Sequence, residues 1–170
     1  LADEYTAKNP EKPRFVAGSV GPTNKTCSMS PDVNNPAYRA LSYDELAASY
    51  QQQMEAMLEG GVDAILIETI FDTLNAKAAI FAAEQAMKAT GVEVPVMLSV
   101  TVSDIGGRTL SGQTLDAFLA SVQHANIFSV GLNCSFGARQ LKPFLEQLAA
   151  RAPYYISAYP NAGLPNSLGK

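Results

Sequence analysis

A cysteine lies at the end of a strand-like segment of the sequence. The apolar segment Ile127–Leu132 is followed directly by Asn133, Cys134 and Ser135, and a helix pattern begins within the next few residues. In parallel α/β proteins, the edge at which buried strands end carries the residues of binding and catalytic sites. A thiolate at such a place can act as a nucleophile or as a soft metal ligand. The alternative is that Cys134 is a small buried side chain that only fills the strand end.

A second candidate is Glu68, which follows the apolar run Ala64–Ile67. Its backbone is expected in a buried strand, where an unpaired carboxylate is costly. One interpretation is structural, with Glu68 in an ion pair or bonded to loop amides. The other is functional, with Glu68 binding a substrate cation such as an amino group. Asp72, four residues later, is typical of a helix N-cap.

Other familiar reactive arrangements lack support in the sequence. No lysine follows a predicted strand, so a Schiff-base mechanism has no nucleophile. The single histidine, His124, falls near the end of a predicted helix, away from the strand ends that carry polar residues. Cys27 stands in a loop without a partner at metal-ligand spacing, and we interpret it as incidental. From the residues alone, Cys134 therefore has no visible partners.

The elements that must position these residues are five apolar segments separated by helix patterns. Several are continuous apolar runs, as expected of strands buried on both faces of a parallel sheet. The predicted strands are Arg14–Val20, Asp63–Thr69, Val94–Val102, Ile127–Leu132 and Tyr154–Tyr159.

The helix patterns carry their own start signals. Ser42 and Glu45 form a capping box. Asp72 or Thr73 can cap the alanine-rich helix that follows the second strand, and Thr114 can cap the next helix.

This alternation predicts an α/β fold, either an open doubly wound sheet or part of a (β/α)8 barrel. No Gly-x-Gly-x-x-Gly segment follows a strand, so the dinucleotide-binding version lacks support. A complete barrel takes about 250 residues, and five strands in 170 residues are about the right share of one. Polar or turn-forming residues follow every strand, which points to a small-molecule site at the carboxyl ends of the strands.

Composition excludes several classes of function. The net charge of -4 and the pI near 4.9 argue against a nucleic-acid-binding surface, which needs a basic face. Two cysteines make no disulfide framework, so we expect a reducing compartment, the cytoplasm. No apolar stretch reaches the ~18 residues of a membrane span. Both ends of the sequence read as those of a piece cut from a larger protein.

Five segments of the sequence resemble, in register and over nearly the whole chain, the homocysteine-binding domain of cobalamin-dependent methionine synthase. They are Phe15–Asn24, Ile67–Lys77, Gly107–Thr114, Gly131–Cys134 and Tyr159–Asn166. The resemblance implies that residues 1–170 are a fragment of one homocysteine-binding (β/α)8 TIM barrel domain. About five βα units are present, and the first two strands and the last strand are missing.

The resemblance also implies the chemistry. Zinc in this family is held by three cysteines, one of which corresponds to Cys134, while the other two are adjacent residues that this sequence lacks. The zinc site is therefore incomplete in this chain. Zinc lowers the pKa of the homocysteine thiol, and the thiolate takes a methyl group from methylcobalamin to give methionine. Cobalamin and methyltetrahydrofolate are bound by other domains of the parent protein.

Residue roles follow from the same resemblance. Glu68 resembles the acid that holds the amino group of homocysteine, and we expect Asn24, Ser99 and Asn133 to bind substrate at neighbouring strand ends. No side chain of this chain is assigned a catalytic role. The expected partners are homocysteine and the cobalamin-binding and folate-binding domains of the parent chain. Self-association through open barrel edges is also expected.

Two alternatives stay open. One is a cobalamin-independent homocysteine methyltransferase that takes its methyl group from betaine or S-methylmethionine. The other is a non-catalytic partial barrel that acts as an interaction module. In either case the isolated fragment is expected to be inactive as a methyltransferase, because it carries only Cys134 of the three zinc ligands.

Overall fold

Five parallel strands form one sheet in the order in which they occur along the chain. The computed structural model describes residues 1–162, so the last predicted resemblance segment, Tyr159–Asn166, lies partly outside the described residues. The strands are β1 (Ala17–Val20), β2 (Ala64–Ile70), β3 (Val96–Val100), β4 (Ser129–Gly137) and β5 (Tyr155–Asn161). The predicted α/β class with five parallel strands is confirmed.

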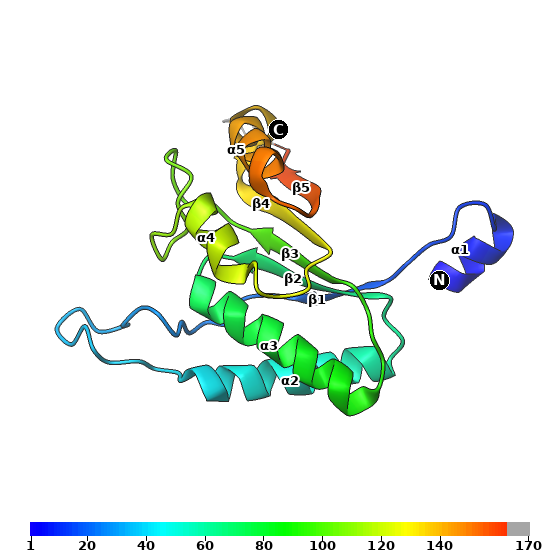
Figure 1. Cartoon of the computed structure of the whole chain (residues 1–170), viewed down its shortest axis with the longest axis horizontal. Coiled ribbons are helices and arrows are strands. Elements are labelled where there is room, and N and C mark those ends of the chain that lie inside the picture. Colours follow the sequence, from blue (N-terminus) through cyan, green and yellow to red (C-terminus); the bar gives the residue numbers. More distant parts are fainter. Residues whose placement is uncertain (163–170) are drawn as a thin grey trace, which may run out of the picture.

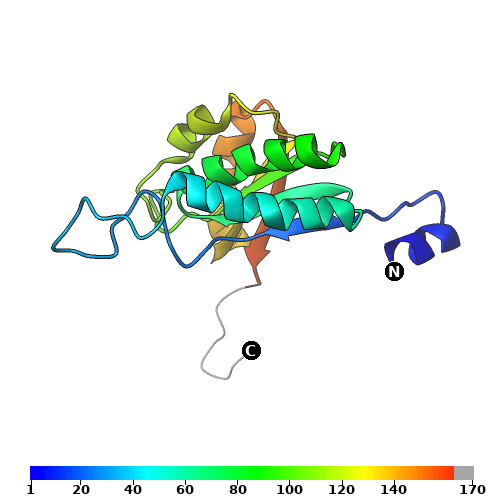
Figure 2. The same ribbon diagram turned by 90° about the horizontal axis from the view of Figure 1, so that it is seen from below.

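Helices connect successive strands on one side of the sheet, as Figure 1 shows. They are α2 (Tyr43–Glu59), α3 (Thr73–Thr90), α4 (Leu115–Val122) and α5 (Ala138–Arg151). A short helix, α1 (Ala2–Lys8), has no buried residue and lies apart from the sheet at the end of an extended segment (Figures 1 and 2).

The predicted start signals of the helices are confirmed. Ser42 and Glu45 make both hydrogen bonds of a capping box at the start of α2. Asp72, rather than Thr73, is the N-cap of α3 and accepts hydrogen bonds from two backbone amides of the first turn. Thr114 caps α4 through the amide of Ala117. Each cap satisfies amide groups that a helix start leaves without partners.

The core lies between the sheet and the helices. Because side chains alternate across a strand, one set of strand residues faces the helices. Ile67, Leu98 and Val130 belong to this set, stand in register across three strands, and are buried. The prediction that both faces of the strands are buried is only partly right. Leu66 and Met97, on the other face of the sheet, are half-buried, since no described helix covers that face.

We call this second face of the sheet the open face. It carries Ser19, Leu66, Glu68, Met97, Ser99, Gly131, Asn133 and Ser157, which share the alternation of their strands. The sheet edges are β1 and β5, and neither has a second neighbouring strand among residues 1–162. Self-association through these edges stays a prediction. No helix of the described residues is both long and apolar enough to cross a membrane.

Strand β4 differs most from its predicted range, because it continues beyond Leu132 to Gly137. A register irregularity between Asn133 and Gly137 accompanies this extension, and β2 has another between Ile67 and Ile70. Bulges of this kind redirect side chains at the ends of strands. Cys134 therefore lies in the final, irregular part of a strand rather than in the loop that follows it.

Strands β4 and β5 approach each other closely at Gly131, and a substitution there tests their pairing. A Cβ atom at Gly131 would collide with the Ser157 hydroxyl and carbonyl oxygens and lie 2.8 Å from the Ser157 carbonyl carbon. Gly131→Ala must push the β5 backbone away, so we expect it to lower the free energy of unfolding by about 1–3 kcal/mol. The measurement is urea denaturation followed by circular dichroism.

Gly18→Ala is the matched control for this variant. A Cβ atom at Gly18 would lie 2.9 Å from Sδ of Met57, the far end of a flexible side chain that can move aside. Equal losses of stability in the two variants would show that the β4–β5 contact is looser than described.

Candidate functional site

The carboxyl ends of β2 and β4 have unusual backbone conformations. Thr69, Cys134 and Ser135 have φ angles of 58°, 58° and 56°, and they are the only residues other than glycine with positive φ in the part of the chain that the structure describes. Such conformations cost of order 1–3 kcal/mol each and persist only where the surrounding structure enforces them. They lie at the ends of two strands that flank β3, which marks the carboxyl ends of these strands as a candidate functional site.

Asn133 connects the ends of three strands. Its side-chain Oδ1 accepts hydrogen bonds from Ser99 Oγ on β3 at 2.7 Å and from the Thr69 amide on β2 at 3.2 Å. Its Nδ2 donates to Thr69 Oγ1 at 3.1 Å and to Cys134 Sγ at 3.0 Å. Asn133 is only 3% exposed, so water does not compete for these bonds. The structure thus brings together three of the predicted site residues, Ser99, Asn133 and Cys134.

The thiol of Cys134 is free and exposed. No group of three or more His, Cys, Asp or Glu side chains among residues 1–162 could hold a metal ion, and residues 163–170 contain neither cysteine nor histidine. Tetrahedral zinc needs at least three protein ligands. Cys134 therefore fits one ligand position, and this chain does not supply the rest of the set.

Glu68 lies on the open face of β2 and is half-buried. Its carboxylate accepts a hydrogen bond from the Ser19 hydroxyl on β1. None of the ion pairs formed within the described residues includes Glu68, and no loop amide donates to it there. Of the two predicted structural explanations, neither the ion pair nor the loop-amide bond is found, and the carboxylate stays accessible at the strand-end edge.

The structure does not join Asn24 to this cluster. Asn24 is exposed in the loop between β1 and α2, and it makes no hydrogen bond with the other predicted site residues. Its role in substrate binding stays a prediction, as do the roles of Glu68 and Ser99. Thr69 was missed by the sequence reasoning because nothing in its type marks a residue with positive φ.

Asp72 has a second role beyond capping α3. Its carboxylate is 1% exposed and accepts hydrogen bonds from the Leu74 amide at 2.9 Å and from the Asn75 amide at 3.3 Å. It also accepts bonds from the amide and the hydroxyl of Ser28, in the loop between β1 and α2. Asp72 therefore fastens this loop to the start of α3.

Asn75 completes the attachment one turn into α3. Its Oδ1 accepts a hydrogen bond from the Cys27 amide at 2.8 Å, and its Nδ2 donates to the Lys25 carbonyl oxygen at 3.0 Å. We call the pair Asp72 and Asn75 the loop clamp. The signal for it was present in the sequence, since a polar Asn75 stands in the alanine-rich helix three residues after the cap, but its partners are 48 and 50 residues away.

The loop clamp buries Cys27, which the sequence reasoning treated as incidental. Cys27 is 6% exposed, and its Sγ lies 3.6 Å from the Ser42 carbonyl oxygen. Burial raises the pKa of the Cys27 thiol, and the negative charges of Asp72 and Glu45 raise it further. Cys27 is therefore held as a protonated, buried thiol.

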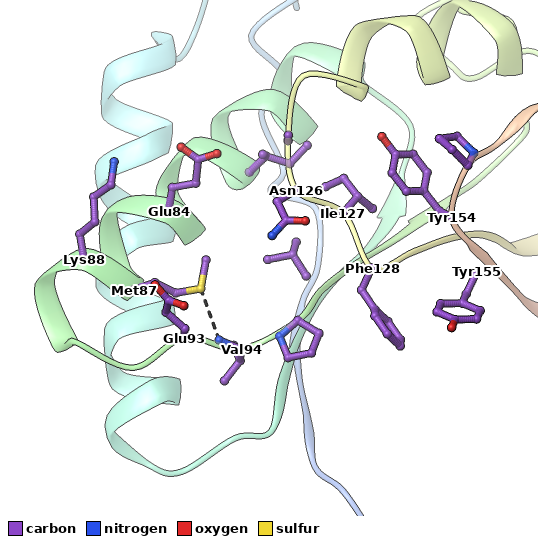
Figure 3. Close-up of a pocket in the computed structure, with 15 residues that line it drawn as sticks. Glu84, Met87, Lys88, Glu93, Val94, Asn126, Ile127, Phe128, Tyr154 and Tyr155 are labelled. Carbon is purple, nitrogen blue, oxygen red and sulfur yellow. Dashed lines mark hydrogen bonds between the residues drawn. The ribbon is translucent and has the colours of Figure 1, made fainter.

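Among residues 1–162, two of the hollows lie at opposite ends of the strands. The smaller, of about 20 Å³, is lined in part by Glu68, Thr69 and Asp72 and has room for about one water molecule. The larger, of about 940 Å³, lies where β3, β4 and β5 begin. Figure 3 shows its walls, formed in part by Glu84, Met87, Lys88, Phe128, Tyr154 and Tyr155. The larger hollow is therefore not part of the strand-end site.

If the loop clamp keeps Cys27 buried, removing it should make the Cys27 thiol more accessible to reagents. Asn75→Ala removes both side-chain bonds to the loop, so the loop should open more often and expose Cys27. Losing hydrogen bonds to buried groups costs about 1–3 kcal/mol, which corresponds to about a 5-fold to 150-fold increase in the rate of Cys27 labelling. The measurement is the rate of Cys27 modification by a thiol reagent at pH 8, resolved by peptide mass spectrometry.

Cys134 is the internal control, since it is exposed with or without the clamp. Ser121→Ala is the matched variant, because it removes a hydroxyl that bonds only to the Ala117 carbonyl oxygen within α4. Unchanged Cys27 labelling in Asn75→Ala would mean that other contacts hold the loop.

Comparison with known proteins agrees with this geometry. The homocysteine methyltransferase MmuM from Escherichia coli has a similar fold in its apo form, with 23% sequence identity and a TM-score of 0.73 over 95% of this chain and 55% of that chain. Its metallated form matches with 23% identity and a TM-score of 0.74 over 95% of this chain and 54% of that chain. This chain thus spans about half the length of these structures, and its sheet is a partial (β/α)8 TIM barrel, as predicted.

A comparison of the sequence with family models shows the family. The family model described as homocysteine S-methyltransferase matches residues 1–170, the whole chain. Cobalamin-dependent methionine synthase, to which the sequence motifs are similar, is of the same family. The chain belongs to the homocysteine S-methyltransferase family.

Proposed function

We propose that this chain is part of a zinc-dependent homocysteine S-methyltransferase and that Cys134 is one of its zinc ligands. The observation that supports this most directly is the exposed Cys134 thiol at the carboxyl edge of a parallel sheet, in a chain of this family. MmuM, which has a similar fold, is known in a metallated form. Bound zinc would supply a Lewis acid that lowers the pKa of the homocysteine thiol.

The reaction is a methyl transfer to sulfur. The homocysteine thiol loses its proton, the sulfur bonds to the methyl carbon, and the bond between that carbon and the donor breaks to give methionine. We propose methylcobalamin as the donor, with cobalamin and methyltetrahydrofolate bound by other domains of a longer parent protein. The similarity of Ile67–Lys77 and Gly107–Thr114 to the cobalamin-dependent type supports this choice. A cobalamin-independent relative with betaine or S-methylmethionine as donor is the second candidate.

Substrate must be fixed at a second point besides its sulfur. Homocysteine carries a cationic amino group. Glu68 presents a carboxylate on the open face of the sheet, near the end of β2 and next to Thr69. Because Glu68 has only a hydroxyl as its partner within the described residues, the carboxylate can still accept from an ammonium group. We propose that Glu68 binds the amino group, with Ser99 and Asn24 as further residues of the substrate site.

Glu68→Gln tests this role in the parent protein. The substitution keeps the shape of the side chain and removes its charge. A charge-assisted hydrogen bond contributes about 1.5–3 kcal/mol, so homocysteine affinity should weaken about 10-fold to 100-fold. Isothermal titration calorimetry of the zinc-loaded protein measures the affinity. Zinc content should not change, since Glu68 is not a proposed ligand.

Glu93→Gln is the matched control, because Glu93 is an exposed acid just before the start of β3, at the opposite ends of the strands. If Glu68→Gln binds homocysteine as tightly as the Glu93 variant does, Glu68 is a structural acid. If Glu68→Gln loses zinc, Glu68 belongs to the metal site instead.

Cys134→Ser tests the metal site. The 170-residue chain should not retain zinc after dialysis against a mild chelator, because one thiolate leaves most of the coordination shell to water. In the parent protein, Cys134→Ser should abolish stoichiometric zinc, whereas Cys27→Ser should not. The measurement is zinc content by atomic absorption. Tight zinc binding by the isolated chain, or zinc retained in Cys134→Ser, would contradict the proposed ligand set.

A further inference from the structure

We propose that Asn133 is a positioning residue, which orients the Cys134 thiol and does not itself contact homocysteine. This inference rests on the proposed function in that it assigns a task to Asn133 within the same site. It departs from the sequence-based expectation, in which Asn133 binds the substrate.

Protein groups use the full hydrogen-bonding capacity of the Asn133 side chain. A primary amide has two donor hydrogens and an oxygen with two lone pairs. Asn133 Oδ1 accepts from Ser99 Oγ and from the Thr69 amide, and Nδ2 donates to Thr69 Oγ1 and to Cys134 Sγ. All four places are taken by protein groups. A substrate atom could bind only by displacing one of them from a buried position.

The orientation of the Asn133 amide is determined by its surroundings. The backbone N–H of Thr69 can only donate, so the atom that faces it at 3.2 Å must be the carbonyl oxygen. This leaves Nδ2 on the side of Cys134 Sγ. The hydrogen bond from Nδ2 to the sulfur is therefore required by the position of the Thr69 amide.

The backbone that Asn133 contacts has an unusual conformation. Thr69 and Cys134 both have φ near 58°, and both are hydrogen-bonded to the Asn133 side chain. Positive φ at these residues is costly without compensating contacts. The two bonds to Thr69 and the bond to the sulfur provide such contacts. Asn133 thus fixes where the thiol points, in the way that outer residues orient the ligands of metal sites.

The chemical character of the amide suits a contact with sulfur. The N–H group of Asn133 can donate a hydrogen bond to the Cys134 sulfur. Because Asn133 is buried, this hydrogen bond is stronger than it would be in water. A carboxylate in the same place could not donate it.

The test uses the 170-residue chain without metal or substrate, so its outcome is independent of the proposed methyltransferase activity. The rate of Cys134 alkylation by iodoacetamide is measured at pH 8 and resolved from Cys27 by peptide mass spectrometry. Asn133→Asp should change the rate of Cys134 alkylation several-fold, because a carboxylate cannot donate the hydrogen bond that holds the sulfur in its orientation. Cys27 alkylation should be unchanged.

Ser121→Ala is the matched control. It removes a hydroxyl that bonds to the Ala117 carbonyl oxygen within α4 and not to Asn133. It should leave the rate of Cys134 alkylation unchanged. An unchanged Cys134 rate in a folded Asn133→Asp chain would overturn the proposal and leave Asn133 a purely structural residue.

A second measurement needs no variant at Asn133. In the unaltered chain labelled with 15N-asparagine, alkylation of Cys134 should shift the side-chain amide resonance of Asn133 and leave that of Asn24 in place. An Asn133 resonance that does not respond would overturn the proposal even if Asn133→Asp failed to fold. If Asn133 contacted homocysteine, Asn133→Ala in the parent protein would weaken homocysteine affinity and leave the rate of Cys134 alkylation unchanged. That result would also contradict the proposed positioning role of Asn133.

Discussion

The arrangement of the strand ends depends on one buried amide. Asn133 joins β2, β3 and β4 through hydrogen bonds to Thr69 and Ser99, and it reaches the next residue, Cys134, through its sulfur. These bonds help to offset the energetic cost of the left-handed backbone at Thr69 and Cys134. The unusual backbone at Thr69 and Cys134 and the position of the thiol are thus linked through the same side chain. A neutral, fully satisfied amide can be buried at little cost.

The two faces of the sheet have different roles. On the helix side, Ile67, Leu98 and Val130 are packed into a continuous apolar core that holds the strands in register. On the open face, polar residues gather towards the carboxyl ends of the strands, where Glu68 and Asn133 lie. The core therefore provides a rigid base, and the strand ends can carry costly backbone and polar groups because the base does not depend on them.

Local signals in the sequence were enough for the order of elements and for the helix starts. Asp72 and Thr114 cap helices as their types predict, and Cys134 lies at a strand end as its position after an apolar run predicts. What local signals could not provide were contacts between distant residues. The bonds between Asn133 and Thr69 span 64 residues, and the bond that buries Cys27 spans 48. Positive φ at Thr69 follows from such contacts, because a β-branched residue has no preference for it.

The choice of an amide beside Cys134 is consistent with the electrostatics of the proposed site. A lysine or arginine in this place would also stabilise a thiolate, but its positive charge would repel both a zinc ion and the ammonium group of homocysteine. Asn133 orients the sulfur through a hydrogen bond and adds no net charge. Glu68, on a separate strand, supplies the negative charge that the proposed function assigns to the binding of the substrate cation.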